Sequence, residues 1–178
     1  GESNCPDDHP VMEIAGPWTV NFDPRRGGPE SVTFPELTDW SQHADEGIRY
    51  YSGAAVYHKV FTIDFTPEKD RSYFLQLEDV RDVGIAVVTL NGKEKETVWT
   101  KPFRVDISGD LKEGDNTLRI KVVNSWFNRV AGDERSSGDR RFTSTNIFLQ
   151  GGAYTILEPS GLLGPVRIMK NEELKMKN

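Results

Sequence analysis

Residues 83–124, VGIAVVTLNGKEKETVWTKPFRVDISGDLKEGDNTLRIKVVN, decide the fold of this chain. Apolar side chains recur along most of the stretch with a period of two residues, which is typical of β-strands. Asn91-Gly92 follows the first apolar run, and this dipeptide accepts the positive φ angles of a tight hairpin, so residues 93–99 are expected to return antiparallel. Two further alternating runs follow, with turn-forming residues between them, at residues 103–107 and 118–122. Four short strands joined by turns predict half of a β-sandwich.

The same alternation occurs outside this stretch. It marks five more short runs, at residues 18–22, 32–34, 56–65, 73–77 and 166–168. No segment carries a sustained helical period, and no repeat of fixed length is present. We therefore predict one all-β domain over residues 16–170, preceded by a flexible lead-in at residues 1–15 and followed by a charged tail at residues 171–178.

Composition and charge argue against several classes of protein. The 178 residues are enough to bury a core without disulfides, and the single cysteine, Cys5, has no partner within the chain. No apolar run approaches the ~20 residues that cross a bilayer, so a membrane span is not expected. The net charge is -6 and the basic residues are scattered, so nucleic acid is not an expected partner. Because the chain starts without Met, we expect a trimmed piece of a longer, secreted or periplasmic protein whose signal peptide has been removed.

Short motifs within the opening stretch carry a resemblance to a known fold family. In chain order they are Leu90-Asn91-Gly92, Pro102-Phe103, Asp106-Ile107-Ser108, Leu111-Lys112-Glu113-Gly114-Asp115-Asn116 and Val122-Val123-Asn124. In this order and with these gaps, the motifs resemble the sugar-binding, galactose-binding-like jelly roll of family 2 glycoside hydrolases. The resemblance implies a single jelly-roll β-sandwich, in agreement with the strand pattern.

Both ends of the chain are similar to a narrower family. The motifs are Gly16-Pro17-Trp18, Gly27-Gly28-Pro29, Leu37-Thr38-Asp39-Trp40, Gly47-Ile48-Arg49-Tyr50-Tyr51-Ser52-Gly53, Asn124-x-Trp126-x-Asn128-Arg129 and Ser160-Gly161-Leu162-Leu163-Gly164-Pro165-Val166-Arg167-Ile168. They resemble the C-terminal galactose-binding-like β-sandwich of family 106 glycoside hydrolases, the α-L-rhamnosidase family. The resemblance implies a non-catalytic accessory domain of an enzyme that removes sugars from plant polysaccharides. It also implies two partners, carbohydrate and the catalytic domain of the parent enzyme, although the large barrel that carries the catalytic carboxylates in that family is missing from this sequence.

Candidate carbohydrate contacts lie in the two longest irregular connections, residues 37–53 and 125–164. A pyranose presents C–H faces that stack on aromatic rings and hydroxyl groups that bond to planar polar groups, so a sugar site needs both kinds of side chain close together. Nine residues of the two connections offer this mixture: Trp40, Arg49, Tyr50, Tyr51, Trp126, Asn128, Arg129, Asp133 and Glu134.

Two structural interpretations of these residues stay open beside the functional one. In the first, Arg129 pairs with Asp133 or Glu134 and merely holds the long loop. In the second, the aromatic residues are core or loop anchors, as most large aromatic side chains are. The second interpretation covers Trp18, Trp40, Tyr57 and Trp99.

No residue is assigned to catalysis by this chain alone. Glycoside hydrolysis needs two carboxyl groups that converge on the scissile bond, and no such pair can be selected from the loop carboxylates Asp39, Asp45, Glu46, Asp133, Glu134 and Glu158. None of the three histidines, His9, His43 and His58, has a second histidine at metal-ligand spacing. No cofactor is expected, apart from a structural calcium ion that scattered loop carboxylates could hold.

Three functions therefore stay open. The first is an accessory domain that contacts glycan or shapes the edge of a neighbouring active site. The second is a purely structural domain that docks on a catalytic barrel through residues 125–164. The third is an independent glycoside hydrolase.

Overall fold

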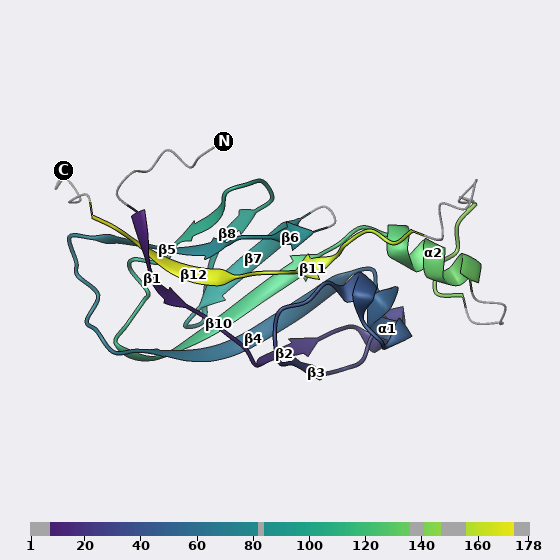
Figure 1. Cartoon of the computed structure of the whole chain (residues 1–178), viewed down its shortest axis with the longest axis horizontal. Helices are drawn as coiled ribbons and strands as arrows, with labels where there is room; N and C mark the ends of the chain where they lie inside the picture. The colour runs from purple at the N-terminus through teal and green to yellow at the C-terminus, as the bar shows by residue number, and fades with distance from the viewer. Residues whose placement is uncertain (1–7, 82–83, 136–140, 147–155, 173–178) are drawn as a thin grey trace.

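The computed structural model describes residues 8–81, 84–135, 141–146 and 156–172, and these form a sandwich of antiparallel sheets (Figure 1). One sheet has six strands in the order β3-β2-β4-β10-β7-β8, and the other has four in the order β1-β12-β5-β9. A short pair, β11-β6, stands apart from both. The all-β sandwich expected from the sequence is confirmed.

The strands are β1 (Asp8–Glu13), β2 (Trp18–Asn21), β3 (Val32–Phe34), β4 (Ala54–Ile63), β5 (Ser72–Leu77), β6 (Val80–Arg81), β7 (Ile85–Leu90), β8 (Lys93–Val98), β9 (Phe103–Asp106), β10 (Gly114–Val123), β11 (Gly161–Leu162) and β12 (Val166–Asn171). The helices are α1 (Glu46–Arg49) and α2 (Phe127–Arg135), with short 3-10 turns η1 (Pro24–Arg26) and η2 (Trp40–Gln42).

The hairpin around Asn91-Gly92 forms as predicted. Asn91 and Gly92 both have positive φ angles, 50° and 80°, and β8 returns antiparallel to β7 from the pair Leu90 and Lys93. Asn91 also ties the turn to its neighbours, because its Nδ2 donates to the Asp110 carbonyl at 2.8 Å. The turn thus fixes the register of two strands and anchors them to the connection after β9.

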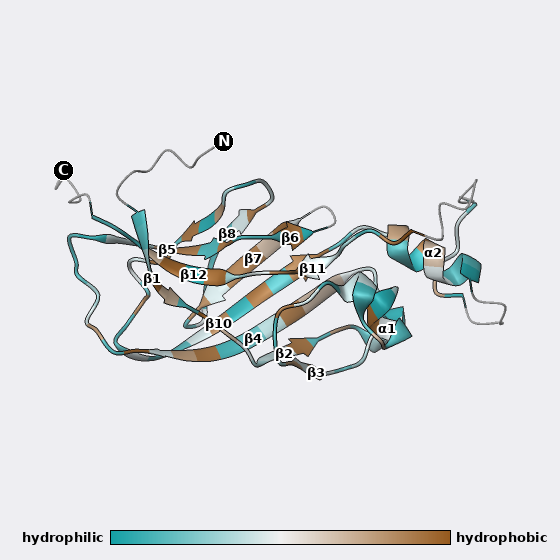
Figure 2. Ribbon diagram, viewed as in Figure 1, coloured by the Kyte–Doolittle hydropathy of each residue, from teal (hydrophilic) through white to brown (hydrophobic). Residues whose placement is uncertain are grey.

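The core lies between the two sheets. Along β10, which pairs with β4 over ten residues, buried positions alternate with outward positions that are mostly polar, and Figure 2 shows the matching alternation of hydropathy. The facing sheet contributes buried residues from β5, β9 and β12, namely Tyr73, Leu75, Leu77, Phe103, Val105, Val166 and Ile168. Each apolar run that the sequence assigned to a strand buries one face, and the run in β7, which is apolar on both faces, fully buries only Ala86, Val88 and Leu90.

An aromatic cluster fixes residues 37–53 against the six-stranded sheet. The Trp40 ring stacks on Tyr57 with 6.4 Å between ring centroids, and Trp40 Nε1 donates a hydrogen bond to the Tyr57 hydroxyl at 2.7 Å. The same hydroxyl accepts from the Leu162 backbone N–H at 3.2 Å, which ties β11 to the cluster. Burial raises the pKa of Tyr57, so this phenol stays protonated and keeps both bonds.

The structure differs from the predicted lead-in at the N-terminus. Residues 8–13 form β1, which pairs antiparallel with β12 from Asp8 opposite Asn171 to Glu13 opposite Arg167. Asp8 forms an ion pair with Arg104 and accepts a hydrogen bond from Asn171 Nδ2 at 2.8 Å. The domain therefore begins by residue 8 and includes Asn171, while residues 1–7 and 173–178 lie outside the described residues.

A helix, α2, stands where no helical pattern was predicted. Its nine residues include three buried polar side chains, Asn128, Arg129 and Asp133, beside the apolar Val130 and Ala131. A helix that turns polar groups toward the protein does not produce the apolar stripe by which helices are recognised. The expectation of a chain without helices is wrong at this point.

Candidate functional site

The predicted carbohydrate contacts gather at one end of the sandwich. There β10 ends at Val123 and β4 begins at Ala54, opposite each other in the sheet, and α1 and α2 lie beyond the strand ends (Figure 1). The structure therefore brings the two long connections, residues 37–53 and 125–164, to a common end of the fold. We describe the nine predicted residues in turn.

Arg49 stabilises its own turn. Its Nε donates to the His43 carbonyl at 2.9 Å and its Nη2 donates to the Ala44 carbonyl at 2.7 Å. Asp45 caps α1 by accepting a hydrogen bond from the Gly47 N–H at 2.7 Å. The neighbouring Tyr50 is buried, and its ring contacts the guanidinium groups of Arg49, Arg129 and Arg135.

Arg129 and Asp133 form a buried ion pair on α2. Arg129 Nη2 lies 3.0 Å from Asp133 Oδ1, and the Asp133 side chain is 2% exposed. Asp133 Oδ2 accepts three further hydrogen bonds, from the Phe142 N–H, the Thr143 N–H and the Thr143 hydroxyl, at 3.1, 2.8 and 2.6 Å. The ion pair thus joins the helix to residues 142–143, which is the loop-holding interpretation of Arg129.

Asn128 is fully buried and bonds to the backbone on the far side of the loop. Its Nδ2 donates to the Glu158 carbonyl at 2.7 Å, and its Oδ1 accepts from the Glu158 N–H at 2.8 Å. Both polar atoms of the amide are therefore engaged within the fold. Asn128 positions residues 156–160 and has no surface for a ligand.

Trp40 and Tyr51 are core residues with no exposed surface. Trp40 belongs to the aromatic cluster described above. The Tyr51 hydroxyl donates to the Ala54 carbonyl at 2.8 Å and accepts from the Asp23 N–H at 3.1 Å, and burial raises its pKa. For these two residues, the interpretation as anchors agrees with their placement, whereas direct contact with a sugar does not.

Trp126 and Glu134 keep exposed surface among the predicted residues. The Trp126 side chain is 51% exposed at the start of α2, and Glu134 lies 3.7 Å from Arg141 in an ion pair at the surface. Trp99, which was grouped with the anchoring aromatics, is 71% exposed at the end of β8, so that interpretation is wrong for this residue. The residue follows the strand in a surface turn, where alternation no longer indicates burial.

Two hollows open at this end of the fold. The first, about 300 Å³, is lined by residues of the η1–α1–α2 region, including Glu46, Tyr50, Arg129 and Arg135, and Arg135 Nη1 donates to the Tyr50 hydroxyl at 3.0 Å. Arg129 Nε has no hydrogen-bond partner among the described residues although it is buried. This hollow therefore combines an aromatic ring, a carboxylate and two guanidinium groups.

The second hollow, about 470 Å³, lies on the other side of residues 50–53. It is lined by Asp23, Arg26, Ser52, Asn124 and Ser125, among others. The Arg25 side chain bonds to Asp23 at 2.9 Å and lowers the pKa of the Asp23 carboxyl group, which keeps it ionised. Trp126, whose side chain is exposed, follows the lining residue Ser125 directly in the chain.

The second hollow contains residues that were not predicted as site residues. Asp23 and Arg26 belong to a run of turn formers, residues 23–29, whose composition indicated only a loop. Asn124 holds the backbone together, since its Oδ1 accepts from the Gly53 N–H and its Nδ2 donates to the Tyr51 carbonyl, both at 2.8 Å. The motif that contains Asn124 was noted, and the structure assigns its side chain to positioning the 50–53 segment.

Three of the candidate acids for catalysis are engaged in local hydrogen bonds or ion pairs. Asp39 accepts from the Ser41 and Ser160 N–H groups at 2.9 and 3.0 Å, and Asp45 and Asp133 are engaged as described above. No group of three or more His, Cys, Asp or Glu side chains is placed to hold a metal ion in the part of the chain that the structure describes. The expected calcium ion therefore has no carboxylate cluster there. None of the described helices is long and apolar enough to cross a membrane.

Comparisons with known proteins relate the whole fold to enzymes that act on glycosides. The structure of a rhamnosidase from Novosphingobium sp. PP1Y matches with a TM-score of 0.77 and 33% identity, over 92% of this chain but 15% of that one. A curated relative, the "Putative beta-glucuronidase" of Formosa agariphila, is 43% identical over 126 residues, which are 71% of this chain and 11% of the relative. A β-D-glucuronidase from Dictyoglomus thermophilum shares the fold, with a TM-score of 0.60, 21% identity and coverage of 96% of this chain and 29% of that chain. No protein-family model matches the chain.

These matches confirm the predicted resemblance to one domain of a larger glycoside hydrolase. The chain spans between about a tenth and a third of the proteins named above, while they cover most of it. It is thus similar to a single β-domain within rhamnosidases and β-glucuronidases.

Proposed function

We propose that this chain is an accessory domain of a larger glycoside hydrolase and that its α1–α2 end contacts carbohydrate. The observation that carries the proposal is a polar hollow of about 470 Å³ whose lining ends at Ser125, the residue before the exposed Trp126. The small share of each related enzyme that the chain spans supports the accessory role. A polysaccharide substrate would also require the parent enzyme to be secreted or periplasmic.

The chemistry of the hollow suits a pyranose. The indole face of Trp126 offers a surface on which the C–H groups of a sugar ring stack. Asp23 and Arg26 supply a carboxylate and a guanidinium group, which hydrogen-bond to neighbouring hydroxyls of the same ring. Ser52 adds a hydroxyl group to the lining. Because the hollow is open, we expect weak binding of a chain end or a single residue, in the millimolar to high micromolar range typical of few contacts.

A calorimetric screen with rhamnose-, galactose- and glucuronate-bearing oligosaccharides tests the proposal. Trp126→Ala is expected to abolish binding of whichever oligosaccharide the wild type binds. Trp99→Ala is the matched control, because it removes a second exposed indole from another part of the surface. Equal loss in both variants, or none in either, would remove Trp126 from the site.

A structural docking role is the second candidate, and the exposure of two apolar side chains, Trp126 and Ile156, favours it. Trp126 directly precedes α2, and Ile156 is two residues before Glu158, whose backbone bonds to Asn128 of α2. In this case the catalytic domain of the parent enzyme covers Trp126. The full-length enzyme would then show Trp126 protected from solvent by hydrogen exchange or quenching, with no oligosaccharide bound by the isolated chain. The small share of each related enzyme that the chain spans does not favour an independent hydrolase.

A further inference from the structure

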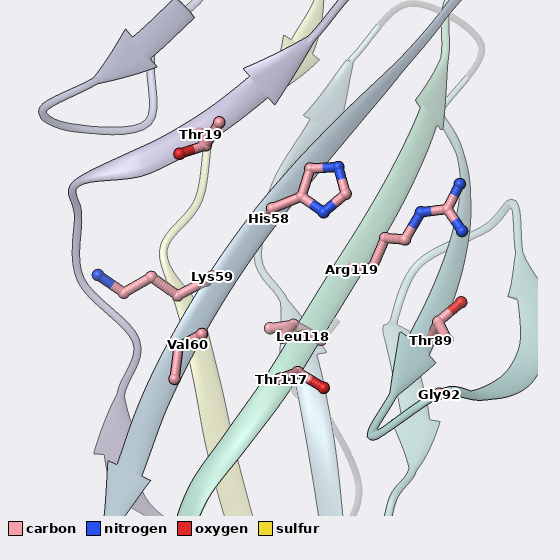
Figure 3. A pocket seen from close by; sticks show the side chains of 9 residues that line it. All are labelled: Thr19, His58, Lys59, Val60, Thr89, Gly92, Thr117, Leu118 and Arg119. Atoms are coloured by element: carbon pink, nitrogen blue, oxygen red, sulfur yellow. The ribbon is translucent and has the colours of Figure 1, made fainter. Parts of the chain in front are cut away.

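The outer face of the six-stranded sheet carries a row of polar side chains that no function above uses. Antiparallel register places four outward residues directly opposite one another across β2, β4, β10 and β7, in the order Thr19, His58, Arg119 and Thr89. Figure 3 shows His58 and Arg119 side by side on neighbouring strands, with the two threonines beyond them. This row crosses the middle of the face, away from the α1–α2 end.

The middle of the face is positively charged in a chain whose net charge is -6. Arg119 and Lys121 point outward from β10, and neither has an ion pair or a side-chain hydrogen bond among the described residues. The outward residues of β2, β4 and β7 include no acidic side chain. Acidic residues stand at the margins of the face, where Asp115 accepts a bond from the Thr62 hydroxyl at 2.6 Å and Glu94 lies on the edge strand opposite Thr89.

This face is also hollowed. A depression of about 480 Å³ is lined by the four residues of the row together with Val60 and Thr117, which form the next register pair on the same face. Val60 is 60% exposed, so the depression offers an apolar surface beside three threonine hydroxyls and a guanidinium group. An unpaired guanidinium next to hydroxyl donors is the arrangement that binds a carboxylate or sulfate group.

We propose that this face binds an acidic saccharide through its carboxylate or sulfate group. The Arg119 guanidinium receives the anionic group, the hydroxyls of Thr19 and Thr89 bond to flanking ring hydroxyls, and Val60 packs against the apolar face of a ring. That the ligand is a saccharide rests on the proposed function, whereas its negative charge is argued from Arg119 and Lys121 alone. The site is separate from Trp126.

The titration of His58 reports occupancy of this site. Burial and then the positive charge of Arg119 lower the pKa of His58 in the free protein. An anion held by Arg119 offsets that charge, so the His58 midpoint is expected to rise when ligand binds. An NMR titration of His58 therefore gives a local readout besides affinity.

The test compares four probes at constant ionic strength: an oligogalacturonate, a sulfated galactose oligosaccharide, the corresponding neutral galactose oligosaccharide and sodium sulfate. We expect the wild type to bind at least one of the acidic saccharides with a rise in the His58 midpoint, and to bind the other two probes at least fivefold more weakly. Arg119→Gln is expected to weaken this binding about fivefold or more. Lys69→Gln, which removes an exposed cation from the loop after β4, is the matched control and should bind like the wild type.

Several outcomes would overturn the inference. If the neutral saccharide binds as tightly as the acidic ones, the face does not discriminate by charge. If sodium sulfate binds as tightly, the face holds an anion only. Equal losses in Arg119→Gln and Lys69→Gln mean that diffuse charge is responsible. Absence of saccharide binding, with an acidic protein surface covering Arg119 in the full-length enzyme, assigns the face to a domain interface instead.

The same experiment separates this site from the α1–α2 end. Trp126→Ala should leave acidic saccharide binding at Arg119 unchanged. If binding depends on Trp126 and not on Arg119, this inference fails and the proposed function stands; with the reverse dependence, the Trp126 site fails and the acidic site stands.

Discussion

At the scale of single residues, the ion pair between Arg129 and Asp133 helps to hold α2 against residues 142–143. Its nitrogen and oxygen atoms are 3.0 Å apart, and both side chains are at least nine-tenths buried. Asp133→Ala would leave the guanidinium without a counter-charge and orphan three donors on residues 142–143, so we expect unfolding to become easier by about 3–5 kcal/mol. Urea denaturation followed by tryptophan fluorescence measures this change.

A control for this prediction is available in the ion pair between Arg25 and Asp23. Its side-chain atoms are 2.9 Å apart, and the Arg25 side chain is 90% exposed. Exposed pairs are screened by solvent, so Arg25→Ala should leave the denaturation midpoint unchanged. A comparable loss in both variants would contradict the view that burial gives the α2 pair its importance.

His58 offers a second prediction at this scale, through its neighbour Arg119. Because burial and the Arg119 charge lower the folded-state pKa, the unfolded chain binds the His58 proton more readily. The contribution to stability is therefore complete above the unfolded-state pKa and is lost as the pH falls from there toward the folded-state value. Arg119→Gln removes one of the two causes, so the His58 midpoint should rise in an NMR pH titration and the acid-side loss should shrink. A midpoint unchanged from the wild type would show that the two groups are not coupled.

At this scale the sequence indicated the possible partners of a residue more readily than its burial. Arg129 was expected either to contact a ligand or to pair with Asp133 or Glu134, and the structure pairs it with Asp133. The choice depended on whether four residues of spacing lay on a helix, which the sequence did not indicate. Trp99 and Trp40 show the same limit, because an indole has the same composition whether it is exposed or buried. Burial is decided by tertiary packing.

At the scale of elements, Gly132 determines how closely α2 can approach α1. A Cβ added at this glycine would lie 2.6 Å from Tyr50 Cγ and 2.7 Å from Tyr50 Cβ, which is too close for two non-bonded carbon atoms. Gly→Ala inside a helix normally stabilises by up to about 1 kcal/mol, whereas forcing extra volume into a packed contact costs about 1–3 kcal/mol. We expect the second effect to win, so Gly132→Ala should lower the urea midpoint.

Gly109→Ala is the matched control for this substitution. A Cβ at Gly109 would meet nothing within 4 Å, and the residue does not need a positive φ angle. The substitution should leave the urea midpoint unchanged or raise it, with an increase of up to about 1 kcal/mol in the free energy of unfolding. If Gly132→Ala also stabilised the protein, α2 would not be held against Tyr50 as the structure describes.

The elements themselves were predictable where a local rule sufficed. The Asn91-Gly92 hairpin has its own turn chemistry, and the β4 and β10 patterns alternate over many residues, so both were predicted correctly. α2 was missed because its buried face includes Asn128, Arg129 and Asp133. β1 was missed because its pattern is only partly buried and contains Pro10, and because its partner, β12, lies at the opposite end of the sequence. Edge strands stabilised by distant pairing leave little local signal.

At the scale of the whole molecule, the sandwich follows from the inward residues of two sheets packing on each other. Those of β4, β10 and β7 and those of β5, β9 and β12 are buried in one cluster. Periodicity predicts which face of each strand is buried, but not which strands are neighbours. The order β3-β2-β4-β10-β7-β8 depends on long-range pairing, as does the meeting of the two irregular connections at one end. That meeting was therefore expected only through the resemblance to a jelly roll, and the second hollow was not predicted.

The pairing of β1 with β12 leads to a prediction about the domain as a unit. Removing residues 1–13 would strip β12 of its outer partner and remove Asp8 from Arg104 and Asn171. It would also uncover the core beside Val11 and Met12, which pack against it. We expect a loss of at least about 2 kcal/mol of stability, together with self-association through the unpaired edge of β12.

Thermal unfolding and light scattering after size-exclusion chromatography test both parts of this prediction. Asp8→Ala is the control, since it removes the ion pair but leaves the strand, and it should cost less stability and leave the chain monodisperse. Because β1 belongs to the four-stranded sheet, truncated protein that stays folded should retain any Trp126-dependent binding at the α1–α2 end. Unchanged stability after truncation would mean that the sandwich does not need β1, in agreement with the domain start at residue 16 that was predicted from the sequence.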